Sequence, residues 1–208
     1  MKATIKLLAV LALVLATFSQ HSSASAGDNF KFRGNFADAG FSMFDETGCV
    51  GTFVGVFANE GKFQSPPGPG SSSVFADMYI DQYDFCNEIS LMSAFGGTSL
   101  GNGAFQINRD LNSAALNATI PVFDLVSGTG FDVSVNLVWT GIGALSRGTF
   151  HSHNKSPGCV INERFTGSSR FAQATGSVSA GVTNFTPNPS GDGHLSSTKS
   201  GTLFIGCN

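Results

Sequence analysis

Residues 113–139 decide the fold class, and they read SAALNATIPVFDLVSGTGFDVSVNLVW. Apolar and polar residues alternate on both sides of a glycine-containing turn at residues 127–130, and a period of two residues is typical of a β-strand with one buried face. The side chains predicted to point inward are Ala114, Leu116, Ala118, Ile120 and Val122 before the turn, and Phe131, Val133, Val135, Leu137 and Trp139 after it. Two such strands joined by a short turn predict an antiparallel hairpin.

Similar patterns recur along the rest of the chain. Phe30, Phe32, Gly34 and Phe36 alternate with polar residues, and residues 49–58 are apolar on both faces, which predicts a strand covered on both sides. Further strands are predicted at 74–86, 89–95, 145–153, 159–166, 170–180 and 202–207, with a long loop over 183–200. The prediction is an all-β fold, an antiparallel β-sandwich or barrel of about ten strands.

The first 26 residues have the pattern of a secretion signal. Lys2 and Lys6 lie at the positive start, residues 7–18 form an apolar run too short to span a membrane, and Ala24-Ser25-Ala26 is a small-residue cleavage site. We therefore expect a signal peptide over 1–26 and a single all-β domain over 27–208. The protein is expected to be secreted and extracellular, or else periplasmic or on the cell surface, with no membrane span after signal removal.

The amino-acid composition limits the kinds of molecule that the protein is expected to bind. Charged residues make up 12% of the chain, about half of what a typical soluble domain carries. Without Lys2 and Lys6, nine basic residues remain against fourteen acidic ones, a net charge near −5. Neither half of the chain contains a dense run of basic residues, so we expect no nucleic-acid partner. Phenylalanine, with 20 residues, has no polar group, and most of these rings are expected in the core.

Four cysteines in an exported chain predict two structural disulfides, which staple the fold. The spacing of Cys49, Cys86, Cys159 and Cys207 along the chain suggests the pairs Cys49–Cys86 and Cys159–Cys207. The sequence leaves all three possible pairings open.

The strand at 74–86 carries the most suggestive functional pattern. Asp77, Tyr79, Asp81 and Tyr83 share one of its faces, and these are the two tyrosines of the protein. Aromatic rings stack on sugars and carboxylates accept hydrogen bonds from hydroxyl groups, so this face is a candidate carbohydrate-binding surface. The simpler interpretation is an ordinary outward face of an antiparallel sheet. Asp77 and Asp81 lie about 13 Å apart on an extended strand, too far for a glycosidase pair at about 5–9.5 Å.

A second candidate is a metal site at His151 and His153, which point to the same side of a strand, with His194 or Asp192 as a further ligand from the late loop. Exposed histidines at a strand end explain this pattern more simply. The mildly basic stretch formed by Arg147, Lys155, Arg164 and Arg170 could meet an anionic polysaccharide, although scattered solvated charges are the simpler interpretation.

The sequence therefore favours a secreted or surface-associated, non-catalytic β protein. Its expected partner is an extracellular polysaccharide, another matrix component or a cell-surface component, bound through the face that carries Tyr79 and Tyr83. No cofactor is expected. One alternative is a secreted polysaccharide hydrolase using Asp77, Asp81 or Glu88. Another is a barrel that binds a small apolar ligand in its interior.

Overall fold

The structure is a computed structural model that describes residues 28–64, 70–156, 159–186 and 190–207. Its described part contains strands and no helix, which confirms the all-β class. The strands are β1 (Asp28–Phe44), β2 (Val50–Gln64), β3 (Ser71–Asp84), β4 (Ile89–Ser99), β5 (Phe105–Ile107), β6 (Ser113–Asp124), β7 (Thr129–Ser156), β8 (Cys159–Ala180), β9 (Thr183–Asn184) and β10 (Ser190–Cys207). The predicted signal peptide lies outside the described residues.

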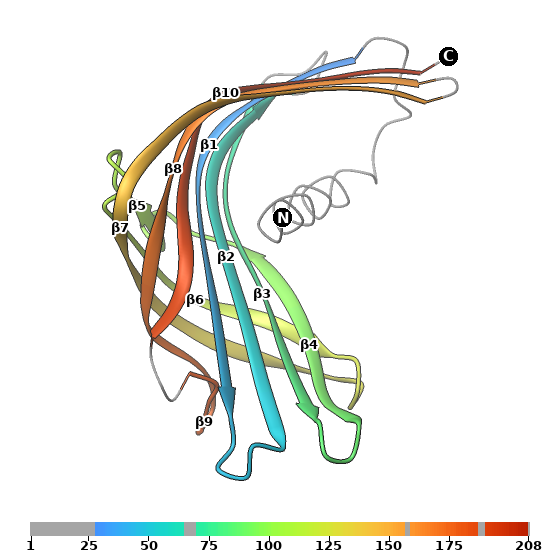
Figure 1. The fold of residues 1–208 in the computed structure, drawn as a ribbon, viewed down its shortest axis with the longest axis vertical. Helices are drawn as coiled ribbons and strands as arrows, with labels where there is room; N and C mark the ends of the chain where they lie inside the picture. Colours follow the sequence, from blue (N-terminus) through green and yellow to red (C-terminus); the bar gives the residue numbers. More distant parts are fainter. Residues whose placement is uncertain (1–27, 65–69, 157–158, 187–189, 208) are drawn as a thin grey trace.

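Eight of the ten strands close into a ring (Figure 1). Their order is β10, β1, β2, β3, β4, β6, β7 and β8, and β8 pairs in turn with β10; β5 and β9 are short additions to β6 and β8. Of the two predicted architectures the structure is therefore the barrel. Its weakest junction joins β4 to β6 through three residue pairs, Ala94–Asp124, Phe95–Phe123 and Gly96–Val122.

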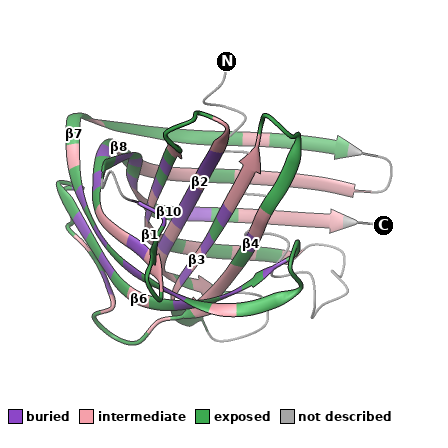
Figure 2. Ribbon diagram, turned by 90° about the horizontal axis from the view of Figure 1, so that it is seen from below, coloured by how far each residue is buried: buried purple, intermediate pink, exposed green. Residues whose placement is uncertain are grey.

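The buried residues of the ring strands form one hydrophobic core, and Figure 2 shows them alternating with more exposed residues along those strands. The predicted hairpin is β6 and β7, paired with Leu116 opposite Leu137. Val133, Val135, Leu137 and Trp139 are all at most 1% exposed, as their alternation predicted. Trp139 also donates a hydrogen bond from Nε1 to the backbone carbonyl of Asp38, at 2.7 Å, which ties β7 to β1 across the inside of the ring.

The strands β7, β8, β10 and β1 continue beyond the ring as an open curved sheet, here called the extension, and the end of β2 flanks it with Gln64 opposite Lys31 (Figure 1). It comprises residues 146–156 of β7, 159–169 of β8, 197–207 of β10 and 28–36 of β1. Register shifts lie where the extension begins, between Ile142 and Ser146 of β7 and between Thr198 and Ser200 of β10. Bulges bend and twist the strand that carries them, so these shifts explain the curvature.

Three predictions about strand limits are wrong, and the first is the separation of the segments at 131–139 and 145–153, which belong to one strand, β7. The predicted long loop over 183–200 is largely strand, because β10 begins at Ser190. The segments predicted separately at 159–166 and 170–180 form one strand, β8, which runs continuously from Cys159 to Ala180. Pro187, Pro189 and the segment Gly191-Asp192-Gly193 suggested the loop, yet Gly191 and Gly193 lie within the paired strand β10.

The predicted location of the phenylalanines is also wrong. In the described part of the chain only Phe41, Phe105 and Phe185 are buried. The ring is filled instead by alanine, branched aliphatic side chains and one tryptophan. Residues 50–64 show why the sequence misled: Val54, Val56 and Ala58 point inward, whereas Phe53 and Phe57 occupy the opposite, half-exposed face of β2, which was predicted to be covered.

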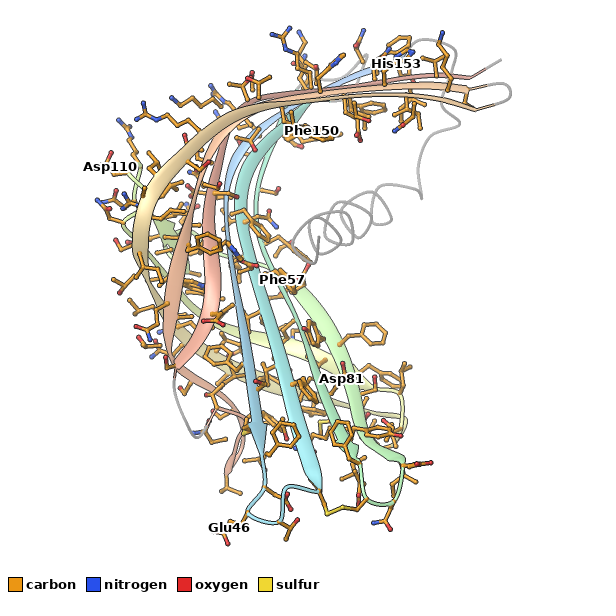
Figure 3. All side chains as sticks on the ribbon, viewed as in Figure 1. Glu46, Phe57, Asp81, Asp110, Phe150 and His153 are labelled. Atoms are coloured by element: carbon orange, nitrogen blue, oxygen red, sulfur yellow. A yellow bond between two sulfur atoms is a disulfide. The ribbon has the colours of Figure 1, made fainter. Side chains whose placement is uncertain are left out.

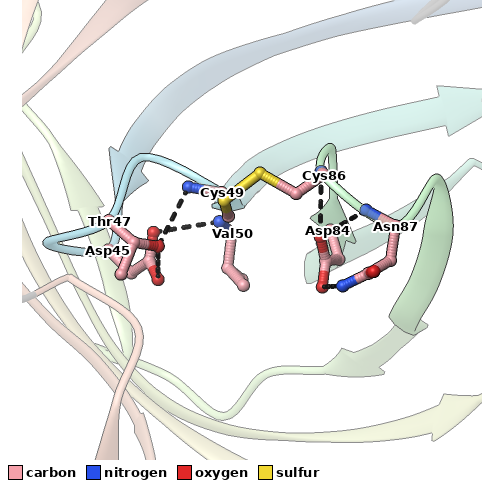
Figure 4. Close-up of a disulfide and its surroundings, with 7 residues drawn as sticks. All are labelled: Asp45, Thr47, Cys49, Val50, Asp84, Cys86 and Asn87. Atoms are coloured by element: carbon pink, nitrogen blue, oxygen red, sulfur yellow. Dashed lines mark hydrogen bonds between the residues drawn. A yellow bond between two sulfur atoms is a disulfide. The ribbon is translucent and has the colours of Figure 1, made fainter.

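The predicted disulfide Cys49–Cys86 is present and joins the β1–β2 turn to the β3–β4 turn (Figure 4). Both turns are stabilised by an aspartate: Asp45 accepts a hydrogen bond from the Val50 amide at 3.0 Å, and Asp84 accepts one from the Cys86 amide at 2.9 Å. The pair Cys159–Cys207 stays a prediction. The backbone places these two residues directly opposite each other on β8 and β10.

Candidate functional site

The four residues of the predicted binding face lie on the outside of the ring. Asp77, Tyr79, Asp81 and Tyr83 alternate along β3 with Ala76, Met78 and Ile80, which are buried inside. Tyr79 is 39% exposed, and the other three are half-buried. The sequence therefore placed this stripe on the correct side of its strand.

Neighbouring strands extend the stripe into a broad aromatic surface. Phe57 of β2 lies directly opposite Asp77, and Phe95 of β4 lies opposite Tyr79. The rings of Phe57 and Tyr79 have their centroids 6.3 Å apart, and Phe57 in turn stacks on Phe36 of β1 at 6.1 Å. Figure 3 labels Phe57 and Asp81 on this surface. We define the aromatic face as Phe36, Phe44, Phe53, Phe57, Phe75, Tyr79, Tyr83, Phe85 and Phe95.

Glycines on adjacent strands make room for these rings. A Cβ atom added to Gly55 would lie 2.1 Å from Cε1 of Tyr79, and one added to Gly97 would lie 2.7 Å from Cζ of Phe75. Each of these two aromatic rings therefore occupies the space that a side chain on the neighbouring strand would take. A ring packed against the backbone in this way presents its other side to solvent, which is the geometry of a stacking platform.

A carboxylate–histidine pair lies at the edge of the aromatic face. Asp38 of β1 accepts a hydrogen bond from the backbone amide of His194 at 2.7 Å, and its Oδ1 lies 3.3 Å from Nδ1 of the same histidine. The ring of Phe171 packs on His194, with centroids 4.8 Å apart. Burial raises the pKa of Asp38, and the interactions with His194 partly offset that rise. Sequence reasoning missed this pair because its members are 156 residues apart.

The two aspartates of the stripe differ in their surroundings. Asp81 accepts a hydrogen bond from the hydroxyl of Ser93 at 2.9 Å. For Asp77, no hydrogen bond or ion pair from another described residue was found, and burial among the rings raises its pKa to about 6. An ionised carboxylate that is half-buried without a partner destabilises the fold, so Asp77 is a candidate for binding an external donor.

Replacing Asp77 by asparagine should stabilise the protein at neutral pH. Because the folded-state pKa of Asp77 is raised, its contribution to stability is fully present below about pH 4 and is lost as the pH rises through about 6. The Asp77→Asn variant lacks this loss. At pH 7 its free energy of unfolding should exceed that of the wild type by roughly 1 kcal/mol, a figure reduced for partial solvent exposure. Urea unfolding at pH 4, 5, 6 and 7 measures the difference. A gap between variant and wild type that stays constant over this range would contradict the assignment.

The candidate metal residues lie elsewhere, in the extension. His151 and His153 alternate along β7 and share one side, and Nδ1 of His153 contacts Oδ1 of Asn162 on β8. His194 and Asp192 lie on β10 beside Asp38 and Gly40 of the ring, so they are not brought to these two histidines. Among the described residues no three histidine, cysteine or acidic side chains are grouped so that they could hold a metal ion.

Comparisons with known proteins give no family. No family model matches the chain, and no curated protein matches it. A solved structure from Nitrosomonas europaea, described as a "putative AttH", covers 92% of this chain at 10% sequence identity with a TM-score of 0.29. The match spans 55% of that protein. None of the described residues forms a helix long and apolar enough to cross a membrane.

Proposed function

We propose that the protein is an exported, non-catalytic binding protein that holds a carbohydrate chain on its aromatic face. The observation that carries this proposal is the packing of rings over glycines, with Tyr79 over Gly55 and Phe75 over Gly97. Each ring turns one side outward, and the apolar faces of sugar rings stack on such surfaces. The disulfide between Cys49 and Cys86 is compatible with an extracellular or periplasmic location.

The polar groups between the rings indicate what kind of carbohydrate fits. Asp77 lies opposite Phe57, and Asp81 lies opposite Phe53, so carboxylates alternate with rings across the two strands. Carboxylates accept hydrogen bonds from hydroxyl groups and repel other carboxylates. The aromatic face therefore suits a neutral polysaccharide, presenting hydroxyl groups to Asp77 while its sugar rings lie on Tyr79 and its neighbours.

The two alternative functions have less support. Asp77 and Asp81 point outward from the ring, and neither residue lines either of the cavities found among the described residues, which measure about 330 and 500 Å³. Glu88 lies in the exposed β3–β4 turn, so it forms no converging pair with them. A barrel for an apolar ligand needs an internal cavity, whereas the inside of this ring is occupied by side chains such as Trp139, Ile80 and Leu137, each 0% exposed.

The proposal is tested by a substitution that displaces the ring of Tyr79 without removing it. Gly55→Ala would place a Cβ 2.1 Å from Cε1 of Tyr79, and this exposed ring must then swing away. Gly40 is the matched control, because it lies directly opposite Gly55 on the same face and its added Cβ would approach nothing closer than 3.9 Å. We expect Gly55→Ala and Tyr79→Ala to weaken binding roughly five- to tenfold, while Gly40→Ala binds as wild type.

Affinity electrophoresis in gels containing β-glucan, xylan, mannan or soluble chitin measures binding, and thermal unfolding checks each variant. Equal retardation of Gly55→Ala and Gly40→Ala by a polysaccharide that binds the wild type would contradict stacking on Tyr79. Failure of all four polysaccharides to retard the wild type would contradict the proposal itself.

A further inference from the structure

Basic residues of four strands in the described part of the chain gather on the side of the extension opposite the rings of Phe32, Phe150 and Phe165. Lys31, Thr202, Arg164 and His151 lie directly opposite one another on β1, β10, β8 and β7, so their side chains share one side of the sheet. Figure 3 shows nitrogen-bearing side chains on this side, where His153 is labelled, and rings including Phe150 on the other. The extension therefore has one basic and one aromatic side.

The aromatic side of the extension is held by contacts among its own rings. Phe32 of β1 packs on Phe165 of β8 with centroids 4.8 Å apart, and Phe165 stacks on Phe150 of β7 at 5.9 Å. Phe32 and Phe165 lie on either side of Gly201 of β10, which has no side chain to separate their rings. A Cβ added to Gly201 would lie 2.3 Å from Cζ of Phe32. Phe32, Phe150 and Phe165 thus share this side, and the other side carries Lys31, Arg164 and His151, with Phe204 of β10 beside them.

Two neighbouring cavities lie on the basic side, where the extension leaves the ring. Their volumes are about 330 and 500 Å³, within the range of ligand pockets, and they share Asn35 and Lys199 in their walls. Together they are lined by five basic residues and by two acidic ones, Asp110 and Glu60. We call this pair of cavities the cationic cleft; its basic residues are Arg33, Lys62, Arg109, Arg147 and Lys199.

None of these five basic side chains forms an ion pair with another residue in the described part of the protein. The one ion pair found there joins His194 to Asp38, outside the cleft. The carboxylate of Glu60 accepts a hydrogen bond from the Asn35 amide at 2.7 Å. Arg33 and Lys62 lie directly opposite each other on β1 and β2, and like charges in that position destabilise a sheet. An anionic ligand would relieve this repulsion.

The remaining wall of the cleft indicates the class of anion. Serine residues line both cavities, Ser168 and Ser197 in one and Ser72 and Ser73 in the other, and the side chain of Ser72 shares the side of Lys62 and Arg33. No aromatic ring belongs to either wall as described, so the cleft lacks the stacking platforms by which proteins bind single-stranded nucleic acid. Cations together with hydroxyls match a ligand that carries both acidic groups and hydroxyl groups.

We propose that the cationic cleft is a second binding site, which takes an acidic polysaccharide through its carboxylate or sulfate groups. Arg33, Lys62 and Lys199 bind the acidic groups, and the serines bind hydroxyls of the sugar rings. The site does not depend on the aromatic face, which lies on the other surface of the same sheet and carries the opposite charge. The protein would then bridge a neutral and an acidic polysaccharide.

The test uses protein purified from an exporting host and two acidic polymers, polygalacturonate and dextran sulfate, with uncharged dextran as the neutral comparison. Arg147→Gln combined with Lys199→Gln removes two charges from the cleft. Lys155→Gln combined with Arg164→Gln removes two charges from the same side of the extension but outside both cavities. We expect the cleft variant to bind an acidic polymer about tenfold more weakly and the control variant to change less than about threefold.

Titration calorimetry at 20 and 150 mM salt measures these affinities, and binding of the wild type should weaken as salt rises. Equal losses of affinity in the two variants would contradict a site in the cleft, because binding would then depend on the total charge of this side and not on the cleft residues. Tighter binding of a single-stranded oligonucleotide or of anionic phospholipid vesicles than of either acidic polymer would overturn the ligand class. The Tyr79→Ala variant should keep its affinity for the acidic polymers whether or not the aromatic face binds neutral sugar.

Discussion

Replacing Trp139 by alanine should lower the free energy of unfolding by about 3–5 kcal/mol, as expected for a buried tryptophan. Trp139 is 0% exposed, so the substitution leaves a large cavity inside the ring. It also removes the donor that satisfies the backbone carbonyl of Asp38 at 2.7 Å. An acceptor buried without a partner adds to the loss.

Asn136→Ala is the matched control, because Asn136 lies on the same strand but faces outward and is exposed. Urea unfolding of both variants measures the difference, and the control should change stability by less than about 1 kcal/mol. Similar losses in the two variants would show that the inward register of β7 is wrong.

Removing the disulfide should have the second-largest effect. Cys49 and Cys86 are 37 residues apart, and a crosslink that closes a loop of this length stabilises a fold by about 3–4 kcal/mol, chiefly by restricting the unfolded chain. The double variant Cys49→Ser and Cys86→Ser should therefore unfold at a much lower urea concentration than the wild type.

Reductant provides the control for this prediction. Dithiothreitol should destabilise the wild type more than the double variant, because the variant has already lost the Cys49–Cys86 crosslink that reductant would break. Non-reducing peptide mapping of the wild type should recover the Cys49–Cys86 linkage. A double variant as stable as the wild type, with that linkage present in the wild type, would show that the closed loop contributes nothing to stability.

Features that depend on one strand alone could be predicted from the sequence. The inward residues of the hairpin, such as Val133 and Leu137, and the outward stripe of Tyr79 and Tyr83 follow from the alternation of side chains along a strand. The spacing along the chain also suggested the pairing of Cys49 with Cys86, although it left the other pairings open. Each of these predictions needed only local information.

Features that depend on the register between strands could not be predicted. Tyr79 packs over Gly55, and Asp38 meets His194, because particular residues lie opposite each other on neighbouring strands. The cationic cleft escaped notice for the same reason: Arg33, Lys62 and Arg147 come from three distant strands, and no stretch of sequence is strongly basic. The phenylalanines were misplaced because their apolar character does not reveal which face of a barrel strand they occupy.

The ring is completed by its first and last strands, and this order bears on how fast the protein folds. β1 pairs with β10, whose 18 residues end at Cys207, so nearly the whole chain must be available before the ring closes. Pairing between such distant segments means a high contact order, and folding is then expected to take milliseconds to seconds. Until β10 docks, β1 and β8 each present an open edge on which other chains could aggregate. For the export proposed above, slow closure would keep the chain unfolded long enough to cross a membrane.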